Sequence, residues 1–101
     1  MSAETENSAS EYTVPSELAL QHAVKISIVK DKPIMLDYWL ASLEKNVIIG
    51  VKEDKEKLLV KSEDEYTSPI SKIFKVETEY LIETENSLYI VSAGIASKRI
   101  A

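Results

Sequence analysis

The fold is decided by residues 47–95, which read VIIGVKEDKEKLLVKSEDEYTSPISKIFKVETEYLIETENSLYIVSAGI. Short β-branched and aromatic runs alternate here with polar turn clusters, which predicts strands at 47–51, 58–60, 70–76, 80–84 and 88–91. Connections of a few residues favour antiparallel pairing, because a parallel pair needs a long crossover. The predicted class is mainly β: a small antiparallel barrel or a two-layer sheet of about six to seven strands, with one short N-terminal helix.

Two of these strands, 47–51 and 88–91, are apolar at successive positions instead of alternating with polar residues. A strand with one face in water alternates, so both faces of these two strands need cover. Either the N-terminal helix or a second chain could supply it. The covering element decides between a monomer and an assembly.

Residues 14–24 carry helical signals, with Pro15 near the start and Ser16 as the cap. After them, 25–28 alternates at period two, Asp31-Lys32-Pro33 forms a turn, and 34–38 resumes the alternation, which predicts a hairpin.

The segment from Pro33 to Lys45 fits two patterns. A strand through Tyr38 is favoured, because the alternating 25–28 segment needs a pairing partner. The helical alternative stays open, since apolar residues also recur there at positions i, i+3, i+4 and i+7. These residues are Leu36, Trp39, Leu40 and Leu43.

With 101 residues, the chain is predicted to form a flexible acidic arm, 1–13, and one β-rich domain, 14–101. The formal charge of -5 belongs mainly to the N-terminal residues, so the body is nearly neutral and lacks the basic field that general nucleic-acid binding needs. The absence of cysteine fits a reducing, cytoplasmic location. The opening residues lack the basic start and apolar run of an export leader, and no stretch has the length of a membrane span, so neither export nor membrane spanning is expected.

No residue set has the spacing of a known catalytic or cofactor site. His22 is the single histidine, and Gly50 and Gly94 stand alone, so histidine-pair chemistry and phosphate loops find no support. The chain is therefore predicted to be no enzyme and to hold no cofactor. Glutamates at even spacings could gather a divalent cation for a hydrolase, but a solvated strand face is favoured. These glutamates are Glu77, Glu79, Glu83 and Glu85.

The leading hypothesis is a non-enzymatic protein-interaction or structural module whose partner is a protein, with self-association included. Aromatic and basic side chains are the candidate partner-binding residues, although the aromatic ones also suit a small core. They are Tyr38, Trp39, Tyr66, Phe74, Lys57 and Lys61.

The alternative hypothesis is a nucleic-acid accessory protein in which lysines line one face of a small barrel beside aromatic stacking platforms. Its lysines are Lys52, Lys57, Lys61, Lys72 and Lys75. Lysines that protect sheet edges from aggregation are the simpler explanation.

Three segments, 31–38, 58–70 and 84–91, carry a resemblance. They read DKPIMLDY, LLVKSEDEYTSPI and TENSLYIV, and they resemble short, uncharacterised β-rich proteins of large double-stranded DNA viruses of eukaryotes. The resemblance implies a virion or a cytoplasmic viral factory as the setting. It implies no activity.

Overall fold

The computed structural model describes residues 13–100. Two helices and eight strands follow one another in these residues. In chain order they are α2 (Glu17–Lys30), β1 (Ile34–Met35), α3 (Trp39–Leu43), β2 (Ile48–Val51), β3 (Lys57–Ser62), β4 (Glu65–Tyr66), β5 (Ile70–Val76), β6 (Glu79–Thr84), β7 (Leu88–Ser92) and β8 (Ala96–Arg99). The predicted acidic arm, 1–13, lies outside the described residues except for Thr13.

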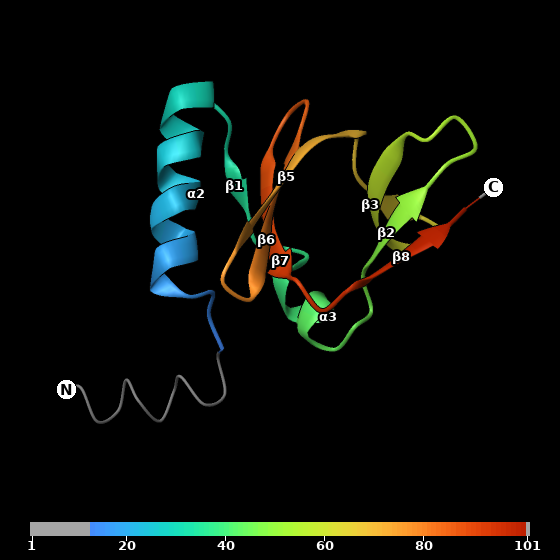
Figure 1. Cartoon of the computed structure of the whole chain (residues 1–101), viewed down its shortest axis with the longest axis horizontal. Coiled ribbons are helices and arrows are strands. Elements are labelled where there is room, and N and C mark those ends of the chain that lie inside the picture. Colours follow the sequence, from blue (N-terminus) through green and yellow to red (C-terminus); the bar gives the residue numbers. More distant parts are fainter. Residues whose placement is uncertain (1–12, 101) are drawn as a thin grey trace.

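The strands form two separate four-stranded sheets. The first sheet has the order β1-β7-β6-β5, and the second has the order β4-β3-β2-β8. In Figure 1, α2 lies against the first sheet, and the second sheet lies on the other side of it. The mainly β class is confirmed, but the sheets do not close into a barrel and there are eight strands instead of six or seven.

Antiparallel pairing is confirmed for the hairpins β2–β3, β5–β6 and β6–β7. The two strands that complete the sheets pair in parallel instead: β1 with β7 and β8 with β2. Both pairs join segments far apart in the chain, which is the long connection that parallel pairing requires. The sequence pattern of 47–95 contains the hairpins but gives no signal for these distant pairs.

The predicted hairpin of 25–28 with 34–38 is wrong, because α2 continues to Lys30. Its N-terminus is capped by Ser16, whose Oγ accepts from the backbone N–H of Ala19 at 3.1 Å. It ends at Asp31, which has a left-handed φ of 56° and donates its backbone N–H to the Ser27 carbonyl. The fully buried Ala19 and Ala23 and the partly buried Ile26 follow helical spacing toward the sheet, and this packing outweighs the local period of two.

The ambiguous segment from Pro33 to Lys45 contains both structures. A two-residue strand at Ile34–Met35 is followed by the short helix α3, so the strand does not reach Tyr38. The helical alternative is therefore right for its second half. Trp39 turns inward and donates its indole N–H to the Thr13 carbonyl at 2.9 Å, whereas Leu40 is 62% exposed.

The core forms two clusters, one on each face of the first sheet. Leu81, Leu88 and Ile90 pack under Ala19 and Ala23 of α2. On the opposite face, side chains of both sheets meet, among them Val47, Ile49, Leu59, Ile82 and Val91. The prediction that both faces are covered is confirmed for 88–91, where the covering elements belong to the same chain. It is confirmed only in part for 47–51, because Ile48 and Val51 are only half-buried.

No helix within residues 13–100 is long and apolar enough to cross a membrane.

Candidate interaction surfaces

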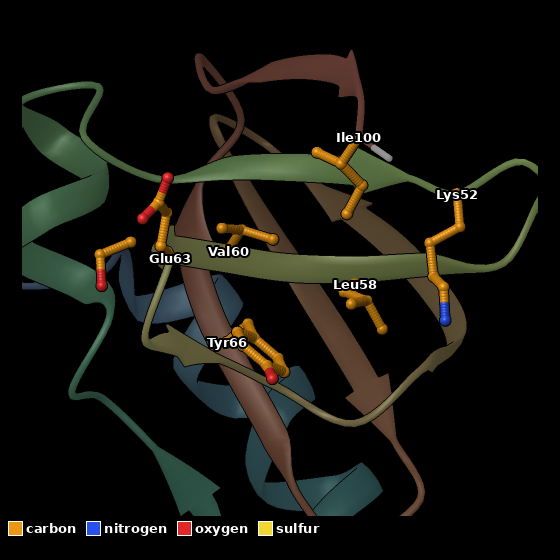
Figure 2. Close-up of a pocket in the computed structure, with 7 residues that line it drawn as sticks. Lys52, Leu58, Val60, Glu63, Tyr66 and Ile100 are labelled. Carbon is orange, nitrogen blue, oxygen red and sulfur yellow. The ribbon is translucent and has the colours of Figure 1, made fainter.

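A shallow groove of about 580 Å³ runs over the outer face of the second sheet, and we call it the β3 groove. Figure 2 shows its lining side chains along β3, with the neighbouring strands on either side. Seven residues line it: Lys52, Leu58, Val60, Ser62, Glu63, Tyr66 and Ile100.

The pleat of β3 determines which side chains reach this groove. Leu59 is fully buried between the sheets, so its neighbours Leu58 and Val60 point to the opposite, outer face. Tyr66 pairs with Val60 across the β3–β4 ladder and is 59% exposed. Gly50 pairs with Leu58, and the side chain of Ile100 fills the space above it, since a Cβ at Gly50 would lie 2.7 Å from Cδ1 of Ile100. The floor is therefore aliphatic.

The two ends of the β3 groove carry opposite charges. Lys52 lies at one end and Glu63 at the other, as Figure 2 shows. The Lys52 ammonium forms a half-exposed ion pair with Glu56 at 3.3 Å, which uses one of its three donors. The exposed Glu63 forms no ion pair within residues 13–100. The groove is thus apolar along its length and dipolar from end to end.

A second, smaller groove of about 360 Å³ lies where the β2–β3 turn approaches the start of β5. We call it the lysine groove, because Lys55, Lys57 and Lys72 line it together with a single acid, Glu56. The other three predicted lysines do not line this groove. Lys52 lines the β3 groove, Lys61 is held near Asp37 and Glu65, and Lys75 lies further along β5, opposite Tyr80.

The outer face of α2 carries both apolar and polar side chains in contact with solvent. Val24, Ile28 and Val29 are 47%, 74% and 78% exposed, whereas the opposite face of the same helix is packed against the first sheet. Gln21, His22 and Lys25 are exposed on the same side of the helix. Large apolar side chains usually reach the surface singly, so three of them on one short helix mark a candidate contact surface. The outward leucines Leu36 and Leu40 add a smaller apolar surface beside α3.

Most of the aromatic residues predicted to bind a partner belong to the core. Tyr38 and Trp39 are 4% and 5% exposed, and Phe74 packs against the cluster beneath α2. Tyr66 alone among these four is exposed. Burial, which the sequence does not reveal, separates the three packing residues from the one available to a partner.

Tyr38 lies in a small polar and aromatic cluster between the sheets. Its ring meets that of Tyr89 edge to face at 5.4 Å between centroids, and the Lys61 ammonium lies 5.3 Å from the ring centroid. Burial raises the pKa of Tyr38 to about 12, and the nearby Tyr89, Glu65 and Asp37 add to the shift. The ammonium of Lys61, which was predicted to bind a partner, therefore already contacts groups within the chain.

The solvated-face interpretation of the even-spaced glutamates is wrong for two of them. Glu79 and Glu83 are 6% and 4% exposed, because they flank Leu81 on the face of β6 that α2 covers. Glu79 accepts from the hydroxyl of Ser16 at 2.9 Å at the start of the helix. Glu83 accepts from the Lys32 ammonium at 2.7 Å just beyond its end. These two carboxylates tie both ends of α2 to the first sheet.

The Lys32–Glu83 ion pair, at 2.7 Å, is the shortest and the most buried one between described residues. Lys32 also donates to the Thr84 carbonyl at 2.6 Å, and the second carboxylate oxygen of Glu83, Oε1, is buried without a hydrogen-bond partner. The hydrogen bond from Lys32 lowers the pKa of Glu83 against the opposing effect of burial, and the charges of Lys30 and Lys72 lower it further. No three metal-ligating side chains gather anywhere in residues 13–100. The sequence contained both residues, but nothing in their spacing paired them.

The fold and these surfaces define a small, mainly β protein with two open sheets and a covering helix. Comparison of the chain with protein-family models, with curated proteins and with solved structures found no match.

Proposed function

We propose that this chain is a non-enzymatic protein-interaction module that self-associates through the outer face of α2. The observation that carries the proposal is the exposure of Val24, Ile28 and Val29 on a helix whose other face is already packed. Burying an aliphatic side chain contributes about 1.5–3 kcal/mol, so a surface of this kind favours association.

A second copy suits this surface because the charges of α2 complement themselves. Glu17 and Lys25 are exposed and line one surface of the helix together with Leu20, Gln21 and Val24. In an antiparallel pair related by a two-fold axis near Gln21, Glu17 of each copy approaches Lys25 of the other copy, and Val24 packs close to the axis. One helix face about 21 Å long buries less than a standard interface, so we expect dissociation constants of about 10–100 μM.

Analytical ultracentrifugation between about 5 and 500 μM tests the self-association. The chain should shift from monomer to dimer, and Ile28→Lys, which places a charge among the apolar side chains of the surface, should remain monomeric. Leu40→Lys is the matched control, since Leu40 is similarly exposed but lies on α3. A monomeric parent chain at the highest concentration, or equal loss of dimer in both variants, would contradict the proposal.

A charge exchange tests the antiparallel geometry. Glu17→Lys alone should weaken the dimer about 2- to 5-fold, because it brings two cations together at each end of the interface. Adding Lys25→Glu in the same chain should restore the affinity. If the second change weakens the dimer further, the two helices do not pair in this orientation.

The nucleic-acid accessory role remains the alternative proposal, and the lysine groove is the observation that favours it. Lys55, Lys57 and Lys72 could contact about three phosphates there. Binding of a single-stranded oligonucleotide that weakens with salt and is lost in Lys57→Gln would support this role. The resemblance to viral proteins adds a virion or viral-factory setting, which the distribution of the protein between purified virions and infected-cell extract tests.

A further inference from the structure

The β3 groove is separate from α2, since the first sheet lies between them (Figure 1). We propose that this groove binds an extended peptide segment of about six residues that carries aliphatic side chains at alternate positions, an acidic group at the Lys52 end and a basic group at the Glu63 end.

The length of the groove matches a short extended chain. Lys52 follows Val51, which pairs with Lys57 at the start of β3, and Glu63 directly follows the end of the same strand. The six residues of β3 therefore separate the two charges by about 20 Å. A hexapeptide in extended conformation spans the same distance.

The floor of the groove has the spacing of an extended peptide. Leu58 and Val60 are two residues apart on β3, so their side chains stand about 7 Å from each other. The alternate side chains of an extended peptide have this same repeat, so aliphatic groups at every second position can pack along the floor. Ile100 and Tyr66 rise on the two sides and bound the groove laterally (Figure 2).

The charges at the two ends favour a peptide over a purely apolar ligand. A fatty acid would satisfy Lys52 with its carboxylate but would leave Glu63 facing an alkyl chain. A peptide with opposite charges at its ends satisfies both. The groove is also open and shallow, whereas sites for small apolar molecules enclose most of the ligand.

The test uses two acetylated and amidated hexapeptides, Glu-Val-Thr-Leu-Ser-Lys and Lys-Val-Thr-Leu-Ser-Glu, and a third peptide with Gln at both ends. Each is titrated into the full ¹⁵N-labelled chain and followed by NMR chemical shifts up to about 2 mM. One charged peptide should bind about 2- to 5-fold more tightly than the Gln-ended peptide, because exposed ion pairs contribute modestly. The shifts should be confined to the residues that line the β3 groove.

Two variants make the outcome decisive. The double variant Lys52→Glu/Glu63→Lys should transfer the preference to the other charged peptide, because the peptide lies in the groove in one chain direction and the exchange reverses the charges that its two ends meet. Tyr66→Ser, at an exposed position that a folded chain tolerates, should weaken all three peptides, whereas Leu40→Ser outside the groove should weaken none. Absence of shifts at 2 mM, shifts on α2 instead, or an unchanged preference in the double variant would overturn the proposal. Tighter binding of dodecanoate than of any peptide at the same residues would also overturn it.

Discussion

Removing the Lys32 ammonium should expose how strongly the buried Glu83 depends on it. The substitution Lys32→Met keeps the length of the aliphatic side chain and removes its charge. Glu83, with a side chain that is 5% exposed, then lacks its direct cation partner. Breaking a buried ion pair by removing one partner costs about 3–5 kcal/mol, because the remaining charge stays desolvated.

Protonation of Glu83 sets a ceiling on this cost. The ordinary pKa of the group is 4.5. Neutralising it at pH 7 therefore costs about 3.4 kcal/mol, at 1.36 kcal/mol per pKa unit, and at pH 5.5 only about 1.4 kcal/mol. We expect the variant to lose about 3 kcal/mol at pH 7 and about 1 kcal/mol at pH 5.5, which is a large share of the stability of a small domain.

The free energies of unfolding of the parent chain and of Lys32→Met should change with pH in opposite directions. In the parent chain the pKa of Glu83 is lowered by folding, so the stability from the pair is present above about pH 4.5 and is lost as the pH falls through the lowered value. In the variant, burial without Lys32 raises the pKa of Glu83 above 4.5. The native state then binds more protons than the unfolded state, and stability decreases as the pH rises from 4.5 to 7.

Urea unfolding followed by the fluorescence of Trp39, the single tryptophan, measures these free energies of unfolding. The control Lys98→Met removes an exposed lysine and should change stability by less than about 0.5 kcal/mol. The double variant Lys32→Met/Glu83→Leu should recover most of the loss, since it removes both charges. Parallel pH curves for the parent chain and Lys32→Met would refute the reasoning.

Three further outcomes are expected. Leu59→Ala, at a fully buried position between the sheets, should lower the free energy of unfolding in urea by about 2–5 kcal/mol. The exposed control Leu40→Ala should change it by less than about 0.5 kcal/mol. Similar losses in the two variants would contradict the core assignment. Ultraviolet titration should show a tyrosine with a pKa of about 12, and this tyrosine should be missing from the titration of Tyr38→Phe. Because folding raises the pKa of Tyr38, the contribution of this side chain to stability should be lost as the pH rises from about 10 toward 12. Gly50→Ala should displace the side chain of Ile100, whose Cδ1 would lie 2.7 Å from the new Cβ. It should therefore alter peptide binding in the β3 groove, measured by NMR, with little loss in the free energy of unfolding, measured in urea.

The hairpins could be predicted from local sequence, because each is specified by residues close together in the chain. The β2–β3 hairpin follows from the apolar runs on either side of the turn that ends near Glu56. Strands β5 to β7 follow in the same way from apolar runs separated by polar turns. The parallel pairing of β1 and β8 could not be predicted, although β1 lies within the strand expected at 34–38. Their partners lie far away in the sequence, and two to four residues are too few to carry a period of their own.

The candidate surfaces were harder to predict than the fold. The lysines and aromatic residues predicted to bind a partner do not form one surface. Trp39 lies in the core, Lys57 lines the lysine groove and Tyr66 lines the β3 groove. The outer face of α2 was missed because residues 25–28 were interpreted as a strand. Only the length of the helix turns Ile28 outward.

The sequence by itself determined that this chain forms β-hairpins with an apolar core and that 88–91 must be covered on both faces, since side-chain period and hydrophobicity are local properties. Tertiary structure decided which groups face one another. In the folded chain Lys32 contacts Glu83, about fifty residues away, and α2 covers the first sheet. Opposite charges lie at the two ends of the β3 groove. These pairings depend on the packing of distant segments, because burial and the low dielectric that follows from it exist only once the sheets and the helix have come together.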